Sequence, residues 1–209
     1  MNETLSRVAA PASLVAFSLL CLALPMLRHR LTHGSGSGFV IARLTDPADR
    51  AIGYAMTTNS NLVMLHALAF AALGPRPLSG CTSAPTWVGL VGVGLVVAAI
   101  GLVMTSQATM GRSWRMCVDD RPTSLVTDGP FALVRNPIYV GTILLNTGVA
   151  VITQTPWAVM ILYAGAWFVA IQARREETHL EQLHGEAYRD YAARVGRFVP
   201  GVGLLRTNA

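Results

Sequence analysis

Charged residues are scarce in this chain, which has 209 residues of which only 13% are charged. Soluble domains carry about 25% charged residues, whereas 52% of the residues here are apolar. This balance excludes an ordinary soluble domain and predicts a membrane protein. At this length we expect one polytopic unit rather than two domains.

Lysine is absent, and all sixteen basic residues are arginine, which leaves a net charge of +5. A basic chain can bind nucleic acid. These arginines are scattered between apolar runs, however, and gather on no single amphipathic surface. We therefore expect no nucleic-acid partner and attribute the arginines to membrane topology.

Cysteine is also rare, with three residues that lie far apart: Cys21, Cys81 and Cys117. No CxxC motif and no His-Cys spacing accompanies them. We therefore expect neither a disulfide scaffold nor a structural metal site. Small buried apolar side chains are the simplest interpretation of these cysteines.

Long apolar runs supply the candidates for membrane-spanning helices. The run at 138–171 is too long for one span and is broken near 153–156, so it predicts a helical hairpin. The second run has a polar middle, TTNSN. A cleaved signal peptide is the alternative for the first run, but no A-x-A site is evident and the positive flank follows the run. The predicted fold is all-α, a bundle of about five transmembrane helices from the runs at 8–27, 51–73, 87–108 and 138–171.

The arginines are distributed unevenly between the loops. Fourteen of the sixteen fall in the segments 28–50, 111–137 and 174–209, and only Arg7 and Arg76 fall on the other side. Cytoplasmic loops are enriched in basic residues. Five spans therefore place the amino terminus outside and the carboxyl terminus in the cytoplasm, in an integral protein of the inner or plasma membrane.

The residues after Glu176 predict an amphipathic helix that continues from the fifth span. Its apolar residues recur at steps of three and four, and Gly196 and Pro200 end it. We expect this helix to lie on the membrane surface or to fold back onto the bundle. The apolar positions are Leu180, Leu183, Ala187, Tyr188, Tyr191, Ala192 and Val195.

Two segments that are rich in polar groups meet at the cytoplasmic ends of the predicted hairpin. The segment SLVTDGPFALVRNPIYVG, 124–141, enters the fourth span, and QARREETHLEQLHGEAYRDY, 172–191, leaves the fifth. Such a site suits a zwitterionic or cationic small molecule that meets an apolar partner. Because the ends of a hairpin are neighbours, we expect one group of side chains to face another: Arg135, Asn136 and Tyr139 opposite Arg174, Arg175, Glu176 and Glu177.

Each of these residues also has an ordinary structural explanation. Arg135 suits an anchor at the cytoplasmic surface, Pro137 suits the start of a helix, and Tyr139 suits the membrane interface. The Arg-Arg-Glu-Glu run suits a solvated helix face. The joint spacing of the two segments favours a site over these separate explanations.

The two segments together resemble the isoprenylcysteine carboxyl methyltransferase and phospholipid methyltransferase superfamily. LVTDGPFALVRNPIYVG is followed about 35 residues later by EETHLEQLHGEAYRDY and then by RFVPG, in the order and spacing of that family. The resemblance covers about the last 100 residues. The matching positions are Leu125, Val126, Gly129, Pro130, Phe131, Arg135, Pro137, Tyr139 and Gly141, then Glu176, Glu177, Leu180, Gly185, Tyr188 and Tyr191.

The resemblance implies an integral-membrane methyltransferase that uses S-adenosylmethionine. A glutamate suits the ammonium of the methionine part, and Arg135 suits its carboxylate or braces the loop. Aromatic faces suit adenine and the sulfonium, and the helix start after Pro137 offers free N–H groups to a negative group. The implied cofactor-binding residues are Thr123, Ser124, Leu125, Val126, Phe131, Arg135, Asn136, Pro137, Ile138, Tyr139 and Glu176.

Three positions depart from the family pattern. Asn136 and Thr123 stand where the family has histidines, and both can still form hydrogen bonds. Gln172 stands where carboxyl-methylating members have an arginine that grips the substrate carboxylate, and a glutamine cannot neutralise that charge. Arg174 and Arg175 are candidates to replace it. The acceptor therefore stays open between an isoprenylcysteine carboxylate, a phospholipid amine and a small apolar thiol.

We assign Gln172, Arg174 and Glu177 to the catalytic part of the site. Methyl transfer is an in-line displacement that mainly requires alignment and exclusion of water. A carboxylate acceptor needs no general base, because its pKa is about 4. A thiol or amine would need one, and Glu177 is the candidate. The opening toward lipid predicts an apolar or lipid-like acceptor delivered from the bilayer.

Two other classes of protein stay open. A membrane reductase of the steroid-reductase type would use NADPH, with Arg112 and Arg115 at its 2′-phosphate. A non-enzymatic membrane protein would use the same motifs to pack helices. In every case we expect a single domain, 1–209, in which 1–110 holds the first three spans and 111–209 holds the loop, the hairpin and the terminal helix.

Overall fold

The computed structural model describes residues 3–33, 46–75, 78, 85–111 and 124–205. Regular structure within these ranges is helical, with no strand beyond isolated bridges, which confirms the predicted all-α class. The elements are α1 (Glu3–Phe17), the π-helix η1 (Ser18–Ala23), α2 (Leu24–His33), α3 (Pro47–Leu73), α5 (Thr86–Met110), the 3₁₀-helix η4 (Gly129–Ala132), α6 (Pro137–Thr153), α7 (Pro156–His184) and α8 (Glu186–Arg194).

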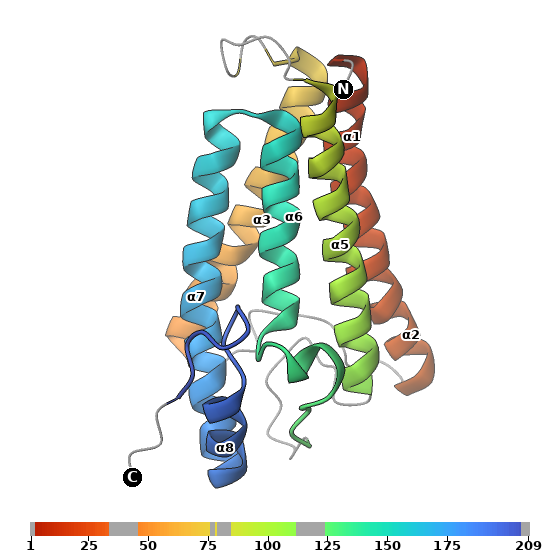
Figure 1. The fold of residues 1–209 in the computed structure, drawn as a ribbon. Coiled ribbons are helices and arrows are strands. Elements are labelled where there is room, and N and C mark those ends of the chain that lie inside the picture. Colours follow the sequence, from red (N-terminus) through yellow and green to blue (C-terminus); the bar gives the residue numbers. More distant parts are fainter. Residues whose placement is uncertain (1–2, 34–45, 76–77, 79–84, 112–123, 206–209) are drawn as a thin grey trace.

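The long helices run side by side in an up-and-down bundle (Figure 1). α1, η1 and α2 form one continuous rod, because the residues that flank η1 keep helical backbone angles. α6 contacts α1, α3, α5 and α7, so it lies in the middle of the bundle. Each apolar run that the sequence predicts as a span is helical here.

The turn between α6 and α7 lies where the sequence predicts a break. Gln154 adopts a left-handed conformation, with φ of 51°, at the end of α6. The Thr155 hydroxyl then accepts a hydrogen bond from the Ala158 N–H at 3.2 Å and caps α7. Pro156 occupies the first turn, where its missing N–H has little cost. The predicted helical hairpin is therefore confirmed.

Glycines allow α5 and α6 to approach closely. A Cβ atom at Gly148 would lie 2.7 Å from the Gly92 carbonyl oxygen and 2.8 Å from a Val96 methyl carbon. A Cβ atom at Gly92 would lie 2.7 Å from the Ile152 side chain. Small residues at helix contacts are how membrane helices pack in the absence of a hydrophobic driving force. This packing fixes α6, whose first turn carries several of the predicted site residues.

Within the part of the chain that the structure describes, three helical segments are long and apolar enough to cross a membrane: Thr4–Arg28, Thr86–Met110 and Pro156–His184. α6 is also apolar but has 17 residues, and the 27 residues of α3 include a polar middle. Large apolar side chains on the outer faces are exposed, such as those of Val97, Tyr163 and Trp167. Exposed apolar surface of this extent is suited to lipid, so the chain is an integral membrane protein.

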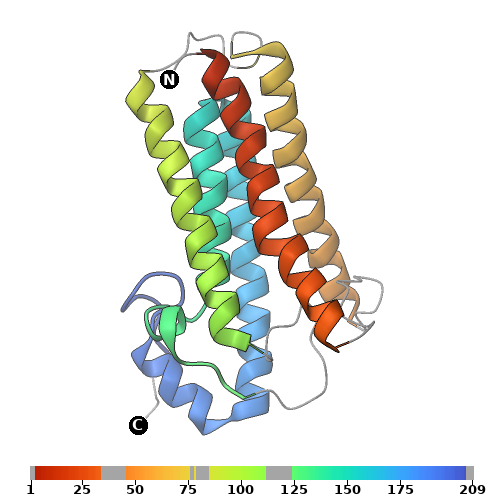
Figure 2. The ribbon, with the colours of Figure 1, turned by 90° about the vertical axis from the view of Figure 1, so that its right-hand side faces the viewer.

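The predicted terminal helix is divided in two. α7 continues to His184, Gly185 takes a positive φ of 56°, and α8 then runs in a new direction (Figure 2). The expectation of one continuous helix is wrong at this point, because glycine adopts such a backbone conformation without strain. The bend lets α8 fold back and bury a small apolar cluster: Tyr188, Tyr191 and Ala192, with Leu125, Leu180, Val195 and Leu205 packed against them.

Candidate functional site

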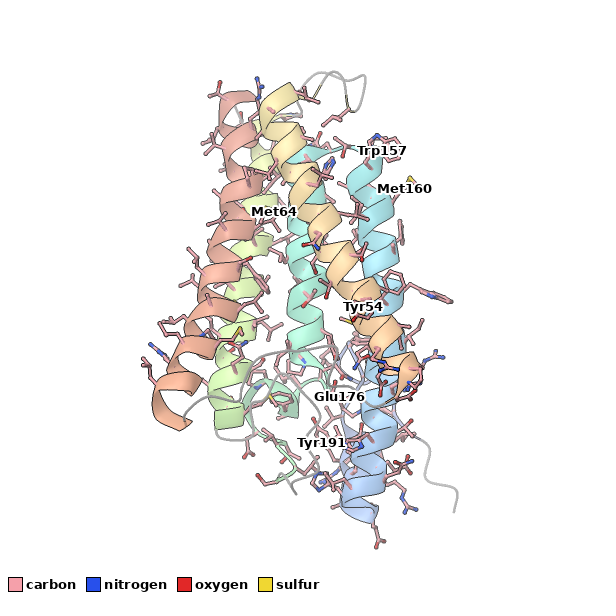
Figure 3. The ribbon with its side chains drawn as sticks, turned by 180° about the vertical axis from the view of Figure 1, so that it is seen from behind. Tyr54, Met64, Trp157, Met160, Glu176 and Tyr191 are labelled. Carbon is pink, nitrogen blue, oxygen red and sulfur yellow. The ribbon has the colours of Figure 1, made fainter. Side chains whose placement is uncertain are left out.

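The two polar segments meet at the end of the bundle where α6 begins and the carboxyl-terminal residues fold back. Figure 3 labels Glu176 at this end of α7, with Trp157 and Met160 at the other end. The Tyr139 hydroxyl donates a hydrogen bond to Glu176 Oε2 at 2.9 Å. The predicted proximity of the start of α6 and the end of the fifth apolar run is therefore confirmed.

Glu177 is the centre of a buried network of charges. Its carboxylate accepts hydrogen bonds from Arg135 Nε at 3.1 Å and from Asn136 Nδ2 at 3.0 Å. Arg197 donates from Nε to Oε1 at 3.1 Å and from Nη2 to Oε2 at 2.7 Å, in the fork geometry that suits a carboxylate. Only 6% of Glu177 is exposed. The Glu177 carboxylate is therefore held in place by three side chains, those of Arg135, Asn136 and Arg197.

Arg135 uses its remaining donors on backbone carbonyls of α8 and of the carboxyl-terminal arm, residues 195–205. Its Nη1 donates to the carbonyls of Ala192 at 3.0 Å and Val195 at 2.5 Å. Its Nη2 donates to the Gly203 carbonyl at 3.0 Å. A buried guanidinium is tolerated only when its donors are satisfied in this way. In this structure Arg135 therefore braces the arm against the start of α6.

Asn136 joins the same network and starts α6 without capping it. Its side chain donates to Glu177 and to the Arg197 carbonyl at 3.3 Å, and it makes no capping hydrogen bond. Pro137 follows in the first turn. The first N–H groups of a helix have no partner within the helix. The start of α6 is therefore a place where a negative group can be bound, next to Tyr139 and Glu176.

Tyr191 fastens α8 to the loop before α6. Its hydroxyl donates to the Phe131 carbonyl at 2.6 Å, and burial raises its pKa to about 12. Tyr188 packs edge-on to Tyr191 with ring centroids 6.1 Å apart. Burial raises the pKa of Tyr188 as well, and its hydroxyl has no hydrogen-bond partner among the described residues. Both phenols therefore stay protonated at neutral pH.

Arg175, a candidate to replace the missing arginine, points to α3 instead. Its Nε donates to Asp49 Oδ1 at 2.5 Å, and its Nη2 pairs with Asp46. Asp46 also caps α3 by accepting from the Ala48 N–H at 2.8 Å, and this backbone hydrogen bond holds the pKa of Asp46 below its ordinary value. Arg174 is exposed on α7. Arg175 is thus committed to the start of α3.

The other predicted site residues have varied surroundings. Gln172 lies one turn before Glu176, within reach of the Tyr139 phenol. Ile138 packs against the main core, and Leu125 against the α8 cluster. Ser124 is exposed and Val126 is half-buried on the approach to η4. Thr123 lies outside the described residues, as do Arg112 and Arg115.

Arg197 is the residue that sequence reasoning missed. Its fork to Glu177 raises the pKa of Arg197, so the guanidinium stays charged throughout the accessible pH range. The sequence carries one signal for it, since Arg197 begins the RFVPG stretch that follows the second segment. A second signal comes from the chemistry of a buried carboxylate. Arg135 alone would leave some acceptor sites of the Glu177 carboxylate unused, so a further donor is expected.

The chain is similar to known proteins in both sequence and structure. Residues 87–187 match the family model described as phospholipid methyltransferase. The nickel-cobalt-cadmium resistance protein NccN of Alcaligenes xylosoxydans xylosoxydans is 28% identical over 119 residues, 56% of each chain. Protein-S-isoprenylcysteine O-methyltransferase B of Arabidopsis thaliana is 30% identical over 120 residues, 56% of this chain and 61% of that protein. The chain therefore spans little more than half the length of these curated relatives.

A solved structure extends the likeness to the whole fold. The eukaryotic intramembrane Ras methyltransferase, an isoprenylcysteine carboxyl methyltransferase, superposes with a TM-score of 0.53 at 17% identity. The superposition covers 98% of this chain and 99% of that chain. At this identity the likeness shows a shared fold, and it includes the α1–α2 rod and α3, which lie outside the residues that match the family model.

Proposed function

We propose that this chain, which belongs to the isoprenylcysteine carboxyl methyltransferase and phospholipid methyltransferase superfamily, is an integral-membrane methyltransferase with S-adenosylmethionine as methyl donor. The observation that carries the proposal is the Tyr139–Glu176 pair at the uncapped start of α6. Residues 1–209 act as one domain. Its five long helical rods cross the membrane, with the amino terminus outside and the carboxyl terminus in the cytoplasm, in agreement with the arginine distribution.

The chemistry of the donor set fits this cofactor. Glu176 offers a carboxylate to a cationic group, and the Tyr139 hydroxyl holds one of its oxygens at 2.9 Å. The first N–H groups of α6 suit the carboxylate of the methionine part. Phe131 and the residues before it supply apolar surface for adenine, with Ser124, Leu125 and Val126 along that approach. When bound, the cofactor supplies an activated methyl group on a sulfonium.

The Glu177 network positions the site rather than reacting in it. Its carboxylate is committed to Arg135, Asn136 and Arg197 and offers little capacity to accept a further proton. We therefore revise the role of Glu177 from candidate base to positioning residue, and we give Arg135 the same role. These residues hold the start of α6 against the end of α7, where alignment decides the rate of an in-line transfer.

The acceptor is proposed to be apolar and to enter from the bilayer, since the site lies at the edge of a lipid-exposed bundle. An isoprenylcysteine carboxylate is the leading candidate, because relatives named for that activity match this chain. Gln172 is neutral and can donate a hydrogen bond to such a carboxylate without neutralising it. A carboxylate reacts without a base, whereas a thiol or amine would need one. Thiol and amine acceptors are therefore the alternatives for the assay.

The test is binding and transfer with matched variants. Calorimetric titration of the purified protein should show binding of S-adenosylmethionine and no binding of NADPH. Glu176→Gln removes the charge that would pair with the cofactor and should weaken binding by about tenfold or more, the scale of one charge-assisted hydrogen bond. Glu181→Gln, five residues further along α7 and partly exposed, is the control.

The outcomes separate the candidate classes. Equal affinity in the two variants would remove Glu176 from the site, and NADPH binding would favour the reductase. Binding of neither ligand would favour a protein without enzymatic activity. Labelled methyl transfer to a panel of prenylcysteine, amine and thiol acceptors then identifies the substrate class.

A further inference from the structure

An apolar turn protrudes from the carboxyl-terminal arm. It comprises residues 198–204, FVPGVGL, and is called the arm turn below. Val199 is 55% exposed and Val202 is 60% exposed. Leu133 is 65% exposed. It lies beside the arm, because its neighbour Val134 forms a bridge with Gly196. Large apolar side chains that are exposed together mark a surface with a partner.

The backbone of the arm turn is paired within the protein. The Val202 N–H donates to the Val199 carbonyl at 3.0 Å, and the Arg197 N–H donates to the Val202 carbonyl at 2.8 Å. Arg135 Nη2 donates to the Gly203 carbonyl at 3.0 Å. Apolar surroundings penalise backbone groups without partners. The turn therefore presents apolar side chains outward while its polar backbone is largely satisfied inward.

The arm turn lies at the depth of the helix ends. In Figures 1 and 2 it rises beside the bundle to the level of the start of α6, above the last residues of α5. α5 is one of the segments that are long and apolar enough to cross a membrane. Whatever layer surrounds the last turns of α5 also surrounds the arm turn. The apolar outer surface of the bundle thus continues onto it.

The charges near the arm turn favour a lipid surface over a protein groove of mixed charge. Asp190 is the last acidic residue of the sequence, and the charged side chains that follow are arginines. Arg194, four residues before the turn, is exposed, while Arg197 is held by Glu177. Anionic lipids of a cytoplasmic leaflet attract basic residues at the membrane surface.

We propose that the arm turn inserts into the interfacial region of the bilayer and anchors the carboxyl-terminal arm to the membrane. The arm is then held from two sides, by lipid at Val199 and Val202 and by the network of Arg135, Glu177 and Arg197. This role needs only that the bundle spans the membrane. It does not depend on methyl transfer.

The test is a spin label at position 202 in bilayer vesicles. Val202→Cys is made in a background with Cys21, Cys81 and Cys117 replaced by alanine, labelled, and reconstituted in phosphatidylcholine and phosphatidylglycerol. Electron paramagnetic resonance then compares collisions with oxygen, which concentrates in hydrocarbon, and with a water-soluble nickel chelate. Asp190→Cys, on the exposed face of α8, is the matched control.

We expect the label at position 202 to favour oxygen over the chelate by several-fold and the label at position 190 to show the reverse. Access of the chelate to position 202 equal to that at position 190 would place the turn in water and overturn the proposal. Protection from both reagents would also overturn it, because a protein partner or second copy would then cover the turn. Val199→Cys repeats the measurement if the first variant does not fold.

Discussion

Two buried polar clusters hold the opposite ends of the bundle, and they differ in charge. At the carboxyl-terminal end, the Glu177 carboxylate pairs with Arg135 and Arg197. At the other end, His66 Nε2 of α3 lies 2.9 Å from Thr155 Oγ1 and 3.4 Å from Thr153 Oγ1 in the turn between α6 and α7. Both clusters join elements that are far apart in the sequence.

The difference in charge between the two clusters reflects how each is buried. Hydroxyl and imidazole groups lose less solvation than ionised groups when they are buried among apolar helices. The charged groups of the Glu177 network are covered by α8 and by the folded arm. Backbone carbonyls of both accept the Arg135 hydrogen bonds that the Glu177 carboxylate does not. The charged cluster therefore depends on every one of its partners. The neutral cluster of His66, Thr153 and Thr155 should tolerate the loss of one partner.

Removal of Glu177 should give the largest effect. Glu177→Ala leaves the buried Arg135 guanidinium and the partly exposed Arg197 guanidinium without a counter-charge. Loss of one partner of a buried ion pair costs about 3–5 kcal/mol. We expect a large fall in the thermal unfolding temperature in detergent. Glu181→Ala is the control, because its carboxylate lies 3.5 Å from Arg189 at the surface and should contribute less than about 1 kcal/mol. Equal losses in the two variants would contradict the buried network.

Loss of a hydroxyl at the other end should have a smaller effect. Thr155→Val removes the cap of α7 and one partner of His66. Each is worth about 1 kcal/mol, so we expect a loss of about 2 kcal/mol in the free energy of unfolding. Thr155→Ser keeps the hydroxyl and should restore most of it. A loss as large as that of Glu177→Ala would show that the neutral cluster is no more tolerant than the charged one.

The smallest effect concerns a charge at the surface. The backbone hydrogen bond from Ala48 lowers the pKa of Asp46 in the folded state. The stabilisation contributed by the ionised Asp46 carboxylate is therefore present above the unfolded pKa of about 4. It is lost as the pH falls through the lower pKa of Asp46 in the folded state. Asp46→Asn keeps the cap but not the charge. We expect slightly lower melting temperatures than wild type at pH 6, and a difference that shrinks as the pH falls below the unfolded pKa of about 4. A difference in melting temperature between the two proteins that stayed constant across this pH range would assign the effect to packing.

Individual residues show how far prediction from the sequence reached. The break at 153–156 and the start of α6 at Pro137 were predictable, because turn and breaker residues act locally. The polar middle of α3 was not explained by its own residues. Asn59 is buried there, with its Nδ2 2.7 Å from where a Cβ atom at Gly165 would lie. A glycine of α7 makes room for an amide of α3, and no pattern within either helix indicates this.

The candidate site divides in the same way. The proximity of Tyr139 to Glu176 followed from the hairpin, since the two ends of a hairpin must meet. The partners of Arg135 did not follow, because they are carbonyls of an arm more than fifty residues later in the chain. Gly185 decided that arm's direction, and the sequence favoured a continuous helix through it.

Hydropathy, arginine placement and local breaker residues by themselves indicated the helices and which of them are apolar and long enough to cross a bilayer. The two polar segments indicated the resemblance to the methyltransferase superfamily. These properties depend on residues near one another in the sequence, so a linear reading is enough. Only the tertiary structure decided that Arg197 completes the Glu177 network, that Arg175 serves α3, and that an apolar turn emerges at the depth of the helix ends. Those outcomes depend on which groups a folded arm can reach, and burial of charge selects the one arrangement in which each is paired.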